Sequence, residues 1–280
     1  MEKKLREHHV GSLVLRGLMY LAAGITVVAL LYVLFYILVN GVPALFTSKG
    51  IFAENVSLLP SLINTLILTA VSLAIAIPLG IGAAIYLSEY AKKRNFFVRV
   101  IELMSETLSG IPSIIYGLFG MIFFVVFLKW DYSLMAGEAT AAIMGLPTIL
   151  STTKEALDAV PDSYREGSFA LGTGKLRTIF KVVLPAAVPG ILSGIILAIG
   201  RIVGETAALL YTSGTATRGL TKGLMSSGRT LAVHMYTISS EGFHTKQTFA
   251  TAVILLIFVF IINTLSSVAA KQISKKAGGQ

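Results

Sequence analysis

The chain has 280 residues, of which 55% are hydrophobic and only 13% are charged, whereas soluble globular domains carry about 25% charged residues. This composition excludes an ordinary soluble protein and indicates an integral membrane protein, and the lack of cysteine excludes disulfides and cysteine-ligated metals. The net charge of +9 would suggest nucleic-acid binding in a soluble chain, but in a membrane protein it depends on where the basic residues lie.

Six apolar segments are long enough to cross a bilayer, whose hydrocarbon core of ~30 Å needs about 20 helical residues. Four of them carry no charged residue and span 17–39, 62–87, 107–128 and 249–270. Segment 133–153 contains Glu138, and segment 186–211 contains Arg201 and Glu205. The sequence therefore predicts an all-α membrane protein with six transmembrane helices. We expect segment 17–39 to remain as an anchor, because no small-residue cleavage site follows it closely.

Basic residues orient these six segments, because short cytoplasmic loops collect Lys and Arg. Most of the 23 Lys and Arg residues lie on one side: Lys3, Lys4, Arg6, Arg16, Lys92, Lys93, Arg94, Arg99, Lys154, Arg165, Lys175, Arg177, Lys181, Lys271, Lys275 and Lys276. Both termini are therefore predicted to be cytoplasmic. The outer loop 212–248 departs from the rule, since it contains four basic residues, Arg218, Lys222, Arg229 and Lys246, and one acidic residue, Glu241. We expect this loop to form a basic surface that attracts anions.

The segment 154–185, between the fourth and fifth spans, breaks the apolar pattern. Pro161 favours the first turn of a helix, and Gly172 and Gly174 are typical of its end, so a short helix is predicted over 162–171. A second short helix is predicted over 175–183, ending at Pro185. A solvated cytoplasmic loop is the simplest interpretation of this segment.

The spacing within this segment favours a more specific interpretation. Glu166, Gly172 six residues later, then Val182 and the pair Leu184 and Pro185 resemble the EAA loop of ABC importer permeases. That pattern reads Glu-Ala-Ala, three residues, Gly, nine residues, Ile, one residue, Leu-Pro. The chain departs from it at 167, 168 and 182, where small residues replace alanines and valine replaces isoleucine.

This resemblance implies a type I ABC importer permease fold in which the loop is a coupling helix seated on a separate ATPase subunit. Tyr164, Phe169 and Leu171 would supply the apolar contact, and Arg165 and Glu166 the polar contacts. The chain has no Gly-x4-Gly-Lys-Ser/Thr phosphate loop. We therefore expect a transport subunit with no catalytic residue, no metal and no cofactor of its own, with ATP and Mg bound by the partner ATPase.

Arg201 lies in the middle of an apolar segment, where an arginine costs about 2.5 to 3.5 kcal/mol unless it meets water, protein or a partner charge. At about 100° per residue, one helical stripe would hold Gly190, Gly194, Ala198, Arg201, Glu205 and Ala208. Such a stripe predicts a face that packs on a partner or lines a pathway. Two interpretations remain open: Arg201 and Glu205 form a structural clamp at i, i+4, or Arg201 meets an anionic substrate while Glu205 holds its side chain.

Three stretches narrow the resemblance: SGIPSIIYGLFG at 109–120, LPAAVPGILSGIILAIGR at 184–201 and GRIVGETAALL at 200–210. Together they resemble PstA-type permease subunits of Pst phosphate importers over 62–267. The resemblance implies an added amino-terminal helix and loop over 1–60, and an ABC importer transmembrane core over 61–280.

The same resemblance implies a bacterial or archaeal inner-membrane complex. Its other components would be a related PstC-type permease, two copies of a PstB-type ATPase and an extracytoplasmic PstS-type phosphate-binding protein. Two alternatives remain: a permease for another oxyanion such as molybdate or sulfate, and a secondary transporter or channel in which Arg201 and Glu205 relay ions. The EAA-like loop argues against the second alternative, because a secondary transporter has no ATPase to dock.

Overall fold

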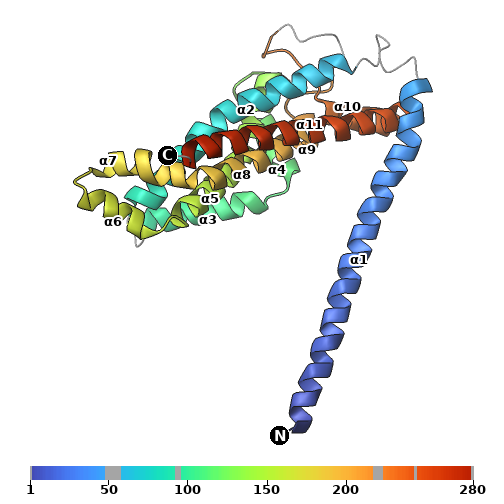
Figure 1. Ribbon diagram of the computed structural model, residues 1–280. Helices are drawn as coiled ribbons and strands as arrows, with labels where there is room; N and C mark the ends of the chain where they lie inside the picture. The colour runs from blue at the N-terminus through green and yellow to red at the C-terminus, as the bar shows by residue number, and fades with distance from the viewer. Residues whose placement is uncertain (1, 48–57, 92–95, 217–222, 243–244, 279–280) are drawn as a thin grey trace.

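The computed structural model describes residues 2–47, 58–91, 96–216, 223–242 and 245–278, and contains no strand among them. Figure 1 shows an elongated helical bundle from which one long helix projects. The α-helices are α1 Glu2–Thr47, α2 Leu59–Ile85, α3 Phe96–Gly110, α4 Ser113–Gly120, α5 Leu134–Asp158, α6 Asp162–Ala170, α7 Lys175–Thr178, α8 Leu184–Val203, α9 Ala207–Leu210, α10 Leu231–Glu241 and α11 Thr245–Gly278. Three π-helical stretches are η1 Tyr86–Tyr90, η2 Met121–Phe127 and η3 Ile179–Val183.

Five helical stretches among the described residues are long and apolar enough to cross a membrane: Ser12–Phe46, Leu59–Tyr90, Leu134–Asp158, Lys175–Val203 and Thr245–Lys275. A sixth is obtained when Val98–Gly110 and Ser113–Phe127 are counted as one span bent by 104°. The predicted all-α class is confirmed, but the third span is not the straight helix expected over 107–128. The break lies at Pro112, whose ψ of 138° is extended and whose ring nitrogen cannot donate to a preceding turn.

Helix α5 forms the centre of the bundle. Its apolar window is 67% buried, against 33% for the α2 stretch and 28% for the stretch that contains α8. Glycines allow the neighbouring helices to approach it closely: a Cβ on Gly80 of α2 would lie 2.8 Å from Ile149. The interior is therefore built by α2 and α8 packing on α5, and side chains such as Met144 and Ile149 are fully buried there.

The small residues of α8 pack inside the chain. A Cβ on Gly190 would lie 2.6 Å from that of Ala156, a Cβ on Gly194 would collide with Thr152, and Ala198 is fully buried. Because Ala156 and Thr152 both belong to α5, this stripe is an intramolecular helix contact. The expectation that the stripe meets a partner subunit or lines a pathway is wrong for these three small residues.

The helix predicted over 175–183 does not end at Pro185. The structure runs α7, η3 and α8 together as one helical stretch, Lys175–Val203. Pro185 lies in the first turn of α8 directly after the π-helical turn η3, so the continuous stretch tolerates a proline whose missing N–H leaves one helical bond unmade. One short helix, α6, is therefore separate from the spans, and the second is the beginning of the fifth span.

Helix α1 lies largely outside the bundle. The apolar window of its span has no buried residue, and it meets the bundle only near its carboxyl end, where Gly41 abuts Phe249 and Val253 of α11. There the ring of Tyr36 meets that of Phe249 edge to face, with centroids 5.6 Å apart. The attachment lies at the α10 end of the bundle, opposite the α6 end (Figure 1).

Candidate functional site

Helix α6 begins and ends as the sequence predicts. Pro161 precedes it with an extended ψ of 138°, and the helix runs over Asp162–Ala170. Gly172 then adopts a φ of +80°, a left-handed conformation that glycine reaches at little cost. Its N–H donates to the carbonyl of Phe169 at 2.9 Å. Gly172 therefore turns the chain sharply back towards α7.

Large apolar side chains on α6 and in the turn that follows it are exposed. Tyr164 is 53% exposed, Phe169 47% and Leu171 85%, and Glu166 beside them is also exposed. Exposed apolar groups rimmed by charge are typical of protein contact sites. The placement of these four side chains agrees with a surface that docks another subunit.

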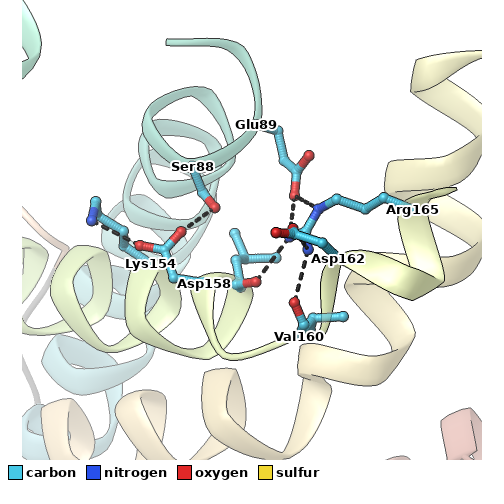
Figure 2. Close-up of polar contacts among 8 residues, drawn as sticks. Ser88, Glu89, Lys154, Asp158, Val160, Asp162 and Arg165 are labelled. Atoms are coloured by element: carbon cyan, nitrogen blue, oxygen red, sulfur yellow. Dashed lines mark hydrogen bonds and ion pairs between the residues drawn. The ribbon is translucent and has the colours of Figure 1, made fainter. Parts of the chain in front are cut away.

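Arg165, in contrast, is turned into the chain, and its side chain is only 16% exposed. Its Nε and Nη2 donate to Oε1 of Glu89 at 3.0 and 2.7 Å, and its Nη1 and Nη2 donate to the carbonyls of Val160 and Leu157 at 2.8 and 3.0 Å (Figure 2). Nη1 also meets Asp162 at 3.3 Å. Arginine has five N–H donors, so all are used within the chain. The polar contact with a partner expected of Arg165 is instead an internal one.

A second cluster of polar side chains, centred on Asp158, lies beside the Arg165 contacts. Ser88 donates to Oδ1 of Asp158 at 2.6 Å, and Lys154 donates to Oδ2 of the same carboxylate at 2.9 Å (Figure 2). Lys154 also pairs with Glu102 of α3 at 3.3 Å. These contacts join the end of α5 to η1 and to α3, so three elements converge next to α6.

Three hydroxyls hold the turn after α6 together. Oγ of Ser168 lies 2.5 Å from Oγ1 of Thr173 and 2.9 Å from Oγ1 of Thr178, and Thr173 also donates to the carbonyl of Ser168. Ser168 stands where the EAA pattern has alanine, and its hydroxyl supplies a contact that alanine lacks. This departure from the pattern therefore strengthens the turn.

Arg201 and Glu205 do not form an ion pair with each other. Helix α8 ends at Val203, and Glu205 lies in the non-helical link before α9, where its Oε1 accepts from the N–H of Ala208 at 3.0 Å. No ion pair within 4.0 Å joins the two residues, and the i, i+4 geometry expected of a continuous helix is wrong. Arg201 is partly exposed. Glu205 caps α9 instead of holding Arg201.

The outer loop 212–248 does not present all of its basic residues on the surface, as was expected, in the part that the structure describes. Arg229 is only 5% exposed, and burial lowers its pKa to about 10 while Glu241 opposes the shift. Asn64 of α2 donates to the Arg229 carbonyl at 3.2 Å. Lys246 is exposed, while Arg218 and Lys222 lie outside the described residues. Arg229 is therefore not part of an anion-collecting surface.

Sequence reasoning missed Glu89, Ser88 and Asp158, because contacts between residues so far apart have no local signal. It also gave no role to Glu138 of α5, whose side chain is 1% exposed and whose two carboxylate oxygens have no hydrogen-bond partner among the described residues. A single acid in an apolar span was the available signal. No cluster of three His, Asp or Glu suited to a metal occurs in the described part of the chain.

Comparison with known proteins places the chain among transport proteins. The sequence profile of the family "binding-protein-dependent transport system inner membrane component" matches residues 76–278. The chain is 32% identical over 243 residues to the probable ABC transporter permease protein YqgI of Bacillus subtilis, covering 81% of this chain and 82% of that protein.

Two further relatives are named as phosphate permeases. The chain is 40% identical over 197 residues to the phosphate transport system permease protein PstA of Yersinia pestis, covering 69% of this chain and 65% of that protein. It is 36% identical over 251 residues to the PstA homolog of Mycoplasma pneumoniae, covering 84% and 37%. The matched region thus spans less than two thirds of these two relatives.

Solved structures share the fold at low identity. A chain of a bacterial alginate ABC transporter in complex with its alginate-bound periplasmic protein matches with a TM-score of 0.71 at 15% identity, covering 92% of this chain and 95% of that one. A chain of the MetNI methionine ABC transporter in an inward-facing conformation matches with a TM-score of 0.65 at 19% identity, covering 81% and 99%. The type I ABC importer permease fold predicted from the sequence is confirmed.

Proposed function

Because the chain belongs to the family of binding-protein-dependent transport system inner membrane components, we propose that it forms half of the membrane pathway of an ATP-driven importer of inorganic phosphate. The observation that carries the choice of substrate is Arg201, a partly exposed cation near the end of an apolar span with no ion-pair partner among the described residues. An unneutralised cation in such a place favours an anionic substrate. The PstA names of two relatives support phosphate.

The remaining components follow from the surfaces that the chain presents. Tyr164, Phe169 and Leu171 form an apolar projection for an ATPase subunit, which supplies the phosphate loop that this sequence lacks and binds ATP and Mg. We propose two copies of this PstB-type subunit, a second permease of PstC type and a PstS-type binding protein outside. This assignment places α6 and both termini in the cytoplasm.

The test is the choice of oxyanion by the assembled complex. The chain is purified with its companion subunits in proteoliposomes, and ATP hydrolysis is measured with the binding protein loaded with phosphate, molybdate or sulfate. We expect phosphate to stimulate hydrolysis and to be taken up. Stimulation by molybdate or sulfate alone would transfer the assignment to another oxyanion, and uptake without any ATPase would overturn it in favour of a secondary transporter or channel.

A further inference from the structure

Helix α6 needs support from its surroundings to transmit a displacement. It has nine residues, and isolated helices shorter than about 12 to 15 residues are marginal in water. The chain itself connects α6 to α5 on one side and to α8 on the other, through α7 and η3. The second span has no such covalent link to α6, so it follows α6 only through contacts across space.

Glu89 makes the contact that reaches from the second span to α6. It belongs to η1, the π-helical turn that continues α2, and its side chain is 7% exposed against 16% for Arg165. The other acceptors of Arg165 come from Leu157, Val160 and Asp162, all at the junction of α5 and α6. Among the described residues that accept hydrogen bonds from Arg165, Glu89 alone lies outside this junction.

Ser88, the residue before Glu89, adds a second contact between η1 and the junction of α5 and α6. Ser88 donates to Asp158, three residues before Pro161, while Glu89 binds Arg165, four residues after it. Two consecutive residues of η1 therefore bind the chain, one before and one after the turn between α5 and α6 (Figure 2). π-Helical turns occur frequently at functional positions.

We infer that Glu89 is a positioning residue that ties the coupling helix α6 to the second span through Arg165, so that the ATPase subunit displaces α2 together with α5 and α8. This inference rests on the proposed function for the presence of an ATPase at α6. The Glu89 carboxylate contacts neither nucleotide nor substrate. Its part is to carry the displacement of α6 directly to α2, in addition to the packing of α2 on α5.

The first experiment compares two amide variants in the complete complex. Glu89→Gln removes the charge that joins η1 to α6, whereas Asp162→Asn removes a contact of the same guanidinium within α6, from a side chain that is 89% exposed. We expect Glu89→Gln to copurify with the ATPase and to hydrolyse ATP, while substrate uptake per ATP falls about tenfold, the size expected for one charge-assisted hydrogen-bonded pair. Asp162→Asn is expected to keep the wild-type ratio.

A second readout measures the link itself. The chain has no cysteine, so spin labels can be placed at Ser163→Cys on α6 and Leu59→Cys at the far end of α2, both exposed positions. We expect the wild-type complex to keep one narrow distance distribution with and without trapped nucleotide, because α2 follows α6. In Glu89→Gln the distribution is expected to broaden or shift when nucleotide is trapped.

Wild-type coupling and wild-type label distances in Glu89→Gln would overturn the inference, as would an equal loss of coupling in Asp162→Asn. If Glu89→Gln fails to assemble, Glu89→Asp keeps the charge on a shorter side chain and is expected to change both readouts in the same direction by a smaller amount; no change would overturn the inference. A complex that imports another oxyanion corrects the proposed substrate, yet its coupling ratio and label distances still test Glu89.

Discussion

Gly172 offers the sharpest test of the turn that follows α6. Its φ of +80° lies in the left-handed region, and a Cβ at this position would meet no atom within 4 Å. The cost of Gly172→Ala is therefore backbone strain alone, about 1 to 2 kcal/mol for a residue with a Cβ. This strain falls on a turn closed by two amides, those of Gly172 and Thr173, which donate to Phe169 and Ser168 at 2.9 and 3.2 Å.

Hydrogen exchange of a peptide covering 168–175 measures this strain in the purified complex. A local cost of 1 to 2 kcal/mol corresponds to about 5- to 30-fold faster exchange of the two amides. Gly174→Ala is the matched control, because Gly174 has an ordinary φ of −73° and equally open space. Gly172→Asn is expected to fall between wild type and Gly172→Ala, since asparagine tolerates the left-handed region better. Equal exchange in the two alanine variants would refute the reasoning.

Three further predictions concern other described residues. Glu166→Lys is expected to leave the chain folded, because the residue is exposed, but to release the ATPase and abolish uptake; normal copurification and transport would contradict the docking surface. Ser168→Ala removes the hydroxyl that meets Thr173 and Thr178 and is expected to lower the stability of the turn by about 1 kcal/mol, seen as faster exchange there, and unchanged exchange would count against that hydroxyl cluster. Burial lowers the pKa of His234 to about 3, and the charge of Arg229 acts in the same direction. Below pH 6.5 the unfolded chain therefore binds a proton at this residue that the folded chain does not. The free energy of unfolding is expected to fall by about 2 kcal/mol between pH 8 and pH 5 as a result. His234→Leu should remove that part of the loss in thermal unfolding scans, and an unchanged pH profile would show that His234 is not the group responsible.

Local signals in the sequence predicted much of the fold. Apolar length alone located the spans, and Pro161 and Gly172 located α6 to within one residue. The end of α8 at Val203 was not predicted, since Gly204 sits in an apolar run and a single glycine does not by itself end a helix. That one boundary separates Arg201 from Glu205, which contradicts the clamp and also the expectation that Glu205 holds the Arg201 side chain.

Contacts between distant segments could not be predicted in the same way. Glu89 and Arg165 are 76 residues apart, and nothing near either residue specifies the other. The direction of Arg165 depends on how α6 lies against η1, which is a result of packing. The stripe of small residues on α8 was visible in the sequence, but whether it faced α5 or another chain was decided by the bundle as a whole.

The most direct test of the account is phosphate uptake by reconstituted complexes that carry Arg201→Gln or the exchange Arg201→Glu with Glu205→Arg. Since the structure gives Glu205 a separate role at the start of α9, exchanging the two charges cannot restore a pair that is not formed. The account predicts that both complexes assemble with the ATPase and import no phosphate. Recovery of uptake in the exchanged variant would contradict it, because it would show that the two residues act as a clamp and that Arg201 has no direct part in moving the anion.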